Sequence, residues 1–240
     1  MRTPLVAFAL SVGAVFAGCT ASSSSPAPVA GTTGTSPVPT DPTPTTTATT
    51  PAPKPTGTAQ PPVTDPQDRG TGCLALTSTV DFWAQQAKTL VTELPSAMCN
   101  FQGSVVLAVN VASYCGYTPQ YTPLEALYQK YKAGGLVVMG FPSKSFNQEK
   151  DTGAEISTFC TTEYHITFPM FAIGDVAGAK KQPVYAWIAT QPGFTADVSW
   201  NFEKFLVSRK GKVVGRYLSA IEPSDATLAA AIEAELAKPK

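Results

Sequence analysis

The chain has 240 residues, with 17 Lys and Arg and 17 Asp and Glu, so its formal net charge is zero. This balance, without any basic block, lacks the electrostatic footprint of nucleic-acid binding, and we expect no nucleic-acid partner. A single histidine and dispersed cysteines form no recognisable metal-ligand cluster. We therefore expect neither a metal nor another cofactor.

Residues 1–18 have the features of a secretion signal. Arg2 precedes an apolar stretch over residues 5–16, and two small residues stand directly before Cys19. This junction resembles the lipobox of bacterial lipoproteins, which implies cleavage before Cys19 and lipid attachment to its sulfur. An ordinary signal peptide with an incidental cysteine is the alternative. We expect an exported lipoprotein of the cell envelope, held through Cys19 at the outer membrane or at a membrane surface facing the periplasm.

Residues 19–70 differ in composition from the rest of the chain. Ser, Thr, Pro, Ala and Gly dominate, and no aromatic residue, Leu or Ile is present. Such a segment has almost nothing to bury that would offset its ordering entropy, so we expect a disordered tether. Residues 71–240 have the length of one domain and contain most of the aromatic residues, which predicts a single globular core.

Two apolar strands and an intervening helix are predicted in the middle of this domain. The strands span residues 105–111 and 136–141, and the first is apolar enough to be covered on both faces. The helix begins at residues 118–119 or at 122–123, and the glycines at 134–135 end it. This order predicts a parallel βαβ unit.

The flanking segments complete a three-layer α/β domain with a mixed sheet. Before the unit the pattern is weak, with a strand expected at residues 90–94 and a turn at 95–103. After it we predict a helix capped by Thr152 and Glu155, a strand at 168–173, a short helix at 183–187, a hairpin with strands at 205–208 and 213–217, and a last helix from Ser224.

Cys115 is the candidate nucleophile. It follows the strand at 105–111 and precedes the predicted helix start. Backbone N–H groups and the positive end of the helix dipole favour the thiolate form of a cysteine in that place.

The other cysteines leave alternatives open. If Cys19 carries lipid, four remain, and four cysteines allow three pairings that the sequence cannot rank. We favour a structural disulfide between Cys73 and Cys99, because both precede the core strand in the segment that most needs a covalent link. This choice leaves Cys115 and Cys160 for chemistry.

Five segments of the domain together resemble one family. They are NVASYCGYTPQY at 110–121, LEALYQKY at 124–131, GFP at 140–142, FCTTEYHITFPMF at 159–171 and WNFEKFLVSRKGKVV at 200–214. In this order they resemble the glutathione peroxidase family, from about residue 103 to the C-terminus. The resemblance implies a thioredoxin-like fold, with a central mixed sheet flanked by helices, and a thiol peroxidase activity.

The resemblance also implies a role for each site residue. The family's cysteine or selenocysteine that attacks the peroxide corresponds to Cys115, an ordinary cysteine here. The family's hydrogen-bond donors to the departing oxygen correspond to Gln148, Trp200 and Asn201. In thioredoxin-dependent members, a cysteine in the FC motif resolves the sulfenic acid by forming a disulfide, which implies this role for Cys160.

Substrate, reductant and assembly follow from the same resemblance. It implies hydrogen peroxide and organic hydroperoxides, lipid hydroperoxides included, as substrates. A second cysteine favours a thioredoxin-like protein as reductant, although glutathione stays open. The loop after residue 142 is one residue shorter than the commoner family form and has Lys144 in place of an asparagine. The extended loop that some relatives use for oligomer contacts is absent between Trp187 and Trp200, which implies a monomer.

The sequence also allows three rival functions. Thiol-disulfide oxidoreductases usually carry a C-x-x-C pair, whereas Cys115 is followed by Gly, Tyr and Thr. A papain-like hydrolase would pair Cys115 with His165, which we expect to be structural. A membrane-tethered binding or structural protein that keeps the thioredoxin fold without peroxidase activity remains the alternative.

Overall fold

The strand predicted at residues 105–111 forms as β3 (Val105–Val111) in the computed structural model, which describes residues 80–239. All seven side chains of this strand are buried, because helices and loops cover both faces of the sheet. The predicted signal peptide, Cys19, the tether and Cys73 lie outside the described residues. No helix within residues 80–239 combines the length and the apolar character needed to cross a bilayer.

The sheet is mixed, as predicted, with strand order β4-β3-β5-β6. Strand β4 (Leu136–Pro142) runs parallel to β3, and β5 (Lys204–Val207) pairs with β3 in the antiparallel direction. Strand β6 (Val213–Tyr217) completes the predicted hairpin with β5. The parallel register pairs Val111 with Pro142, so β3 and β4 end at the same edge of the sheet.

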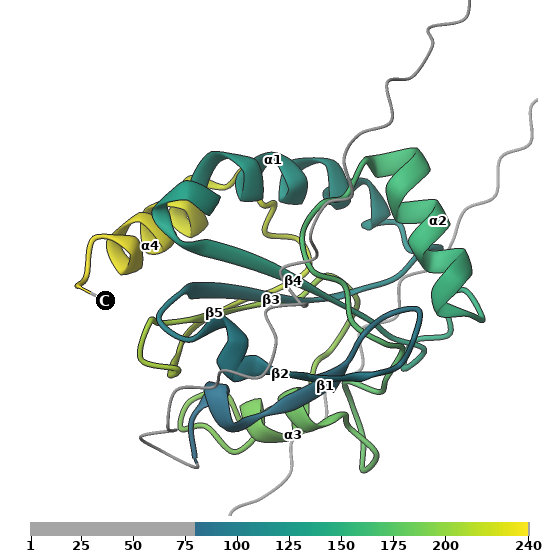
Figure 1. Ribbon diagram of the computed structural model, residues 1–240, viewed down its shortest axis with the longest axis horizontal. Coiled ribbons are helices and arrows are strands. Elements are labelled where there is room, and N and C mark those ends of the chain that lie inside the picture. Colours follow the sequence, from purple (N-terminus) through teal and green to yellow (C-terminus); the bar gives the residue numbers. More distant parts are fainter. Residues whose placement is uncertain (1–79, 240) are drawn as a thin grey trace, which may run out of the picture. The chain divides into compact units, whose positions relative to one another are not determined.

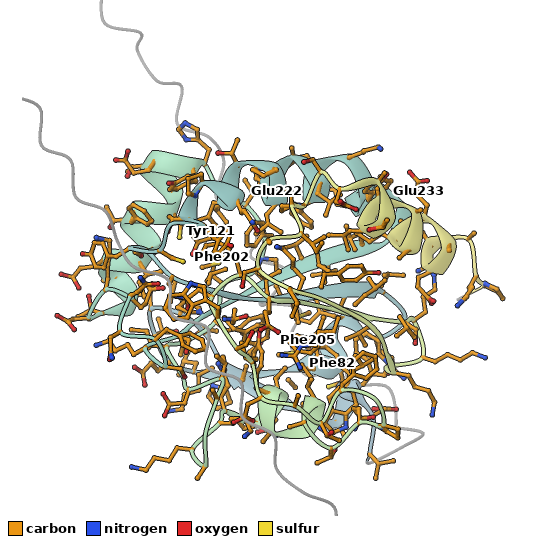
Figure 2. All side chains as sticks on the ribbon, turned by 180° about the vertical axis from the view of Figure 1, so that it is seen from behind. Phe82, Tyr121, Phe202, Phe205, Glu222 and Glu233 are labelled. Atoms are coloured by element: carbon orange, nitrogen blue, oxygen red, sulfur yellow. The ribbon has the colours of Figure 1, made fainter. Side chains whose placement is uncertain are left out.

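Helices cover the two faces unequally. The helices α1 (Tyr121–Tyr131), α2 (Gly153–Tyr164) and α4 (Ala226–Leu236) lie on one face, and α3 (Pro183–Ile188) lies on the other with the hairpin of β1 (Gln86–Lys88) and β2 (Pro95–Ala97) (Figure 1). Figure 2 shows Tyr121 and Phe202 in the first layer, and Phe82 and Phe205 in the second. Each face of the sheet has its own cluster of buried apolar side chains, and the apolar side chains of β3 alternate between the two clusters.

Short 3₁₀ turns extend or link these elements. They are η2 (Phe82–Ala84), η3 (Met98–Phe101), η4 (Thr118–Gln120) and η5 (Lys132–Gly134). The alternative helix start at residues 118–119 is the correct one for the helical segment, because η4 begins there and continues directly into α1. The α-helix itself begins at Tyr121, one residue before the alternative start at 122–123, and no side chain of the described residues caps it. Gly135, with φ of 99°, ends the segment as the glycine pair predicts.

Other helix boundaries agree with the predicted caps. Thr152 and Glu155 form the reciprocal capping box of α2. The short helix α3 begins at Pro183 as predicted and ends at Ile188, one residue later than expected. The last helix is capped by Asp225 and begins at Ala226, two residues after the predicted start.

Two predicted strands and one predicted turn are wrong. Residues 90–94 form the turn between β1 and β2, and residues 95–103 contain β2 and η3. Residues 168–173 make only isolated bridges, in which Gly140 binds the flanking backbone of Pro169 and Phe171. Proline lacks the N–H that would extend the pairing with β4. Phe171 bridges Thr89 and Ala172 N–H donates to Lys88 O (2.8 Å), so the segment makes one bridge on each side.

Candidate active site

The turn that carries Cys115 is closed by Thr118. Cys115 N–H donates to Thr118 Oγ1 (3.0 Å), and the Thr118 hydroxyl donates to Ala112 O (2.9 Å). The Cys115 sulfur accepts the N–H of Tyr117 at 3.4 Å, immediately before η4 begins. Its side chain is a free thiol and 6% exposed. The predicted place of Cys115, between the strand and a helical start, is confirmed.

The segment after β4 holds this turn through Glu149. Glu149 Oε1 accepts hydrogen bonds from Ser113 N–H (3.1 Å), from the Ser113 hydroxyl and from Lys150 N–H (2.8 Å). Tyr114 N–H donates to Gln148 O at 2.9 Å. Burial raises the pKa of Glu149, and the hydrogen bonds from Ser113 and Lys150 partly offset this rise. Hydrogen bonds therefore link residues 113 and 114 directly to residues 149 and 148.

Two of the three predicted donors touch each other. Asn201 Nδ2 donates to Gln148 Oε1 at 2.9 Å, and Asn201 is fully buried. Trp200 is 41% exposed, and its ring packs against Phe146 with centroids 5.2 Å apart. Gln148 O also accepts the N–H of Tyr114, which places the backbone of Gln148 beside the Cys115 turn. Within residues 80–239, none of the three donates a hydrogen bond to the Cys115 sulfur in this state.

A buried polar group holds the backbone of Trp200 in place. Asn110 Nδ2 donates to Trp200 O (3.0 Å), and Asn110 Oδ1 accepts Glu203 N–H (3.1 Å). The Glu203 carboxylate is fully buried, accepts Ser199 N–H (2.7 Å) and pairs with Arg216 (2.6 Å). The roles of Asn110 and Glu203 are not predicted from the sequence. One signal was available, since Asn110 is the polar residue in an otherwise apolar strand.

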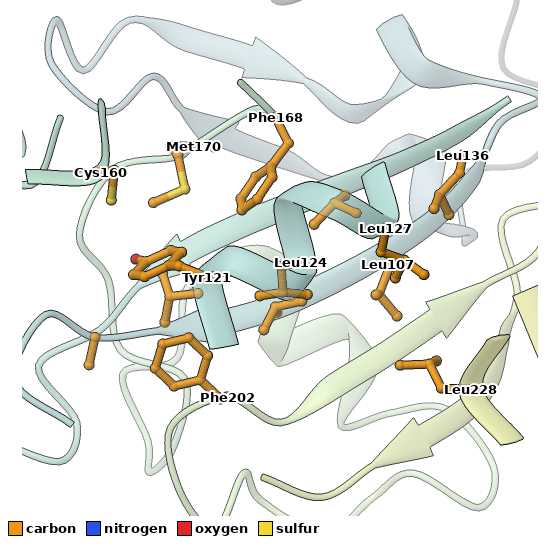
Figure 3. Packing of buried hydrophobic residues seen from close by; sticks show 14 of the residues in the cluster. Leu107, Tyr121, Leu124, Leu127, Leu136, Cys160, Phe168, Met170, Phe202 and Leu228 are labelled. Atoms are coloured by element: carbon orange, nitrogen blue, oxygen red, sulfur yellow. The ribbon is translucent and has the colours of Figure 1, made fainter. Parts of the chain in front are cut away.

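Cys160 lies in the last turns of α2, where it is 2% exposed and free. It belongs to the same apolar cluster as Cys115 and Tyr121, and Figure 3 shows it with Met170 beside the Tyr121 ring. Burial raises the pKa of the Cys160 thiol to about 11, and the nearby Tyr121 hydroxyl offsets only part of this rise. That hydroxyl makes no hydrogen bond of ordinary geometry within the described part of the chain. Cys160 is therefore a protonated, packed thiol at neutral pH.

The remaining candidates are also accounted for. Cys99 is disulfide-bonded, and because Cys73 lies outside the described residues its pairing with Cys99 stays a prediction. His165 ends α2 in the left-handed conformation (φ 53°), and its ring contacts Thr161 O rather than Cys115. The described residues contain no group of three His, Cys, Asp or Glu that could hold a metal ion.

Comparisons with known proteins agree with this geometry. The family described as glutathione peroxidase matches residues 82–189. The chain is 48% identical over 132 residues to the glutathione peroxidase-like peroxiredoxin gpx1 of Schizosaccharomyces pombe, covering 54% of this chain and 84% of that protein. It is 44% identical over 148 residues to the hydroperoxy fatty acid reductase gpx1 of Synechocystis sp., covering 58% and 86%.

A solved structure extends the similarity to the fold. The crystal structure of Trgpx in apo form superimposes with a TM-score of 0.54 at 33% identity, covering 68% of this chain and 99% of that one. The similarity thus spans most of each relative's own length and agrees with the observed order of strands and helices. The chain belongs to the glutathione peroxidase family, and it is a peroxidase with a thioredoxin-like fold.

Proposed function

We propose that the protein reduces hydrogen peroxide and organic hydroperoxides through Cys115. The observation that carries this proposal is the free Cys115 thiol, whose sulfur accepts the N–H of Tyr117. The turn that holds it is bound to the Gln148 segment through Tyr114 N–H. The Cys115 thiolate attacks one peroxide oxygen, and the O–O bond breaks. The other oxygen leaves as hydroxide or alkoxide and takes up a proton, while Cys115 becomes a sulfenic acid.

Gln148, Trp200 and Asn201 are proposed to stabilise the negative charge on the departing oxygen. Gln148 uses its side-chain oxygen to accept from Asn201, so its own NH₂ group is available to a substrate. The indole N–H of Trp200 binds no other described residue, and the ring is partly exposed and packs against Phe146. Donors aimed at a developing oxyanion lower the barrier to its departure.

Cys160 is proposed to resolve the sulfenic acid. Its thiolate attacks the Cys115 sulfur, the S–O bond breaks, and the departing hydroxide takes up a proton to become water. Because Cys160 is packed inside α2, we infer that the helix opens locally before the sulfurs bond. A thioredoxin-like protein, or else glutathione, then returns two electrons and two protons to the disulfide.

Fatty acid hydroperoxides are proposed among the substrates. The Synechocystis relative is named a hydroperoxy fatty acid reductase. In this chain, the exposed Trp200 ring and its neighbour Phe146 offer apolar surface, and Phe146 lies on the same segment as Gln148. A monomer, proposed from the short segment between residues 187 and 200, would leave this side open to a bulky substrate. A stable dimer in sedimentation would contradict the monomer.

Replacing each cysteine separately tests the two thiol roles. Reduced protein is mixed with one equivalent of hydrogen peroxide, trapped, and analysed by mass spectrometry. Cys115→Ser should abolish peroxide consumption, because the attacking sulfur is lost. Cys160→Ser should consume one equivalent, accumulate the sulfenic acid and form no disulfide. An unreactive Cys115 in the parent protein would favour the alternative of a tethered binding or structural protein. If Cys160→Ser kept the steady-state peroxidase rate of the parent with a thioredoxin donor, Cys160 would not be the resolving cysteine.

Replacing Trp200 by Phe tests the donor role. Trp200→Phe keeps an aromatic ring against Phe146 but removes the N–H, so the rate constant for Cys115 oxidation should fall roughly a hundredfold. Stopped-flow measurement of this oxidation is the readout. Trp187→Phe is the matched control, because that indole donates to Val80 O (2.9 Å) and packs in a different apolar cluster from the one that contains Cys115. Equal rates for Trp200→Phe and the parent would exclude the indole as a donor.

The pH dependence of disulfide formation tests whether α2 opens first. Below the pKa of Cys160 its thiolate fraction, and with it the rate, rises about tenfold per pH unit. The buried thiol has a pKa of about 11, whereas an exposed thiol has the ordinary value of about 8.5. Since we propose that α2 opens before Cys160 attacks, the rate of disulfide formation should stop rising near the ordinary pKa of an exposed thiol, about 8.5.

The control for this profile is Cys160→Ser resolved by an added small thiol of known pKa. It separates any titration of the sulfenic acid from that of Cys160. A rate that keeps rising toward pH 11, after this correction, would mean that Cys160 attacks from the closed helix.

Export and membrane attachment are proposed from residues 1–70 alone, all of which lie outside the described structure. Two acyl chains on Cys19 suffice for stable membrane association. The parent protein should therefore sediment with membranes, and Cys19→Ala should move to the soluble fraction. Immunoblots of both fractions provide the measurement, and Cys19→Ala that stays on the membrane would contradict a lipid anchor at this residue.

A further inference from the structure

Lys150 contacts both segments that carry free cysteines. Its Nζ lies 4.6 Å from the centroid of the Tyr114 ring and 5.0 Å from the centroid of the Phe159 ring. It also donates a hydrogen bond to the Tyr114 hydroxyl at 2.9 Å. Tyr114 directly precedes Cys115, and Phe159 directly precedes Cys160. One cation thus bridges the neighbours of the two thiols.

The contact on the α2 side continues toward Cys160 through a row of aromatic rings. Phe159 packs edge-on against Tyr164 with centroids 5.4 Å apart, and Tyr164 lies 5.2 Å from the Tyr121 ring. Tyr121 is also the residue whose hydroxyl influences the Cys160 thiol. Because Phe159 and Cys160 are adjacent in the helix, α2 cannot unravel at Cys160 without moving Phe159. Opening of the helix therefore breaks the contact between Lys150 and Phe159.

The contact on the Cys115 side is better fixed. Tyr114 N–H binds Gln148 O (2.9 Å), and Glu149, between Gln148 and Lys150, binds Ser113. The backbone of Lys150 is thereby tied to the Cys115 turn, because its own N–H also donates to Glu149. Of the two bridged segments, α2 is the one that has to move.

We propose that Lys150 is a positioning residue for the resolving step, linking Phe159 to Tyr114 through its ammonium group so that α2 stays closed and Cys115–Cys160 disulfide formation is slowed. This proposal rests on the proposed function, in which Cys160 resolves the sulfenic acid. In that step the Cys160 sulfur bonds to the Cys115 sulfur, the S–O bond breaks, and the hydroxide leaves as water with the thiol proton. The oxidising equivalent comes from the peroxide consumed at Cys115.

A slower resolving step has a chemical consequence. While α2 is closed, the sulfenic acid at Cys115 persists and a second peroxide can oxidise it to the sulfinic acid. Lys150 thus influences the competition between the reversible disulfide and irreversible oxidation. An exposed cation–π contact stabilises the closed state only modestly, so its loss should accelerate opening about two- to fivefold.

Three variants of the full chain test the proposal. Lys150→Ala removes the cation, Lys150→Arg keeps a cation that can stack on both rings, and Lys130→Ala is the matched control. Lys130 lies 4.5 Å from the centroid of the Tyr131 ring on α1, a contact of the same kind that involves neither cysteine segment. Each reduced protein receives one equivalent of hydrogen peroxide, and disulfide formation is timed from the sulfenic acid by acid quench and mass spectrometry. Amide hydrogen exchange of α2 is measured in parallel.

Lys150→Ala should form the disulfide about two- to fivefold faster than the parent, with faster exchange in α2. Lys150→Arg and Lys130→Ala should match the parent in both measurements. A rate in Lys150→Ala equal to or below that of the parent, or unchanged exchange in α2, would overturn the role of Lys150 and leave the resolving role of Cys160 intact. Equal acceleration in Lys150→Arg would also overturn it. Absence of any disulfide in the parent would overturn both proposals.

Discussion

Parallel pairing of β3 with β4 is the constraint on which the site depends. Val111 pairs with Pro142, so both strands end at the same edge of the sheet. The chain leaves β3 into the Cys115 turn and leaves β4 into the segment that carries Gln148, so both arrive at this edge. In open α/β sheets, the carboxyl ends of parallel strands are where functional loops gather. Without this register the hydrogen bond from Tyr114 to Gln148 could not form.

Buried polar side chains then hold the loops in place. Asn110, Glu149 and Glu203 are all at least nine-tenths buried, and each accepts or donates hydrogen bonds to the backbone of a loop. A buried polar group is costly unless paired, so these bonds admit few alternative loop positions. Glu149 Oε2 is the exception, because it is buried without a partner among the described residues. The Glu149 carboxyl therefore holds the Cys115 turn through one oxygen.

The two free thiols occupy one apolar cluster but differ in chemistry. Cys115 is in a turn, and its sulfur accepts a backbone N–H. Cys160 is inside the capped helix α2, where burial of the thiol raises its pKa to about 11. In the proposed mechanism, peroxide reduction at Cys115 needs no helix to open, whereas disulfide formation requires α2 to open at Cys160. Lys150 contacts the neighbours of both thiols.

Local pattern in the sequence determined the elements whose burial or capping is encoded within a few residues: β3, β4, the capped α2, and the hairpin of β5 and β6. Linear motifs also determined the family and the place of Cys115. Tertiary structure decided the rest. Residues 168–173 look like a strand but make only single bridges, Met170 with β4 and Phe171 with Thr89, and residues 90–94 form a turn because their neighbours pair with each other. The roles of Asn110, Glu149 and Lys150 depend on partners distant in sequence or on a neighbouring loop, and periodicity carries no information on such contacts.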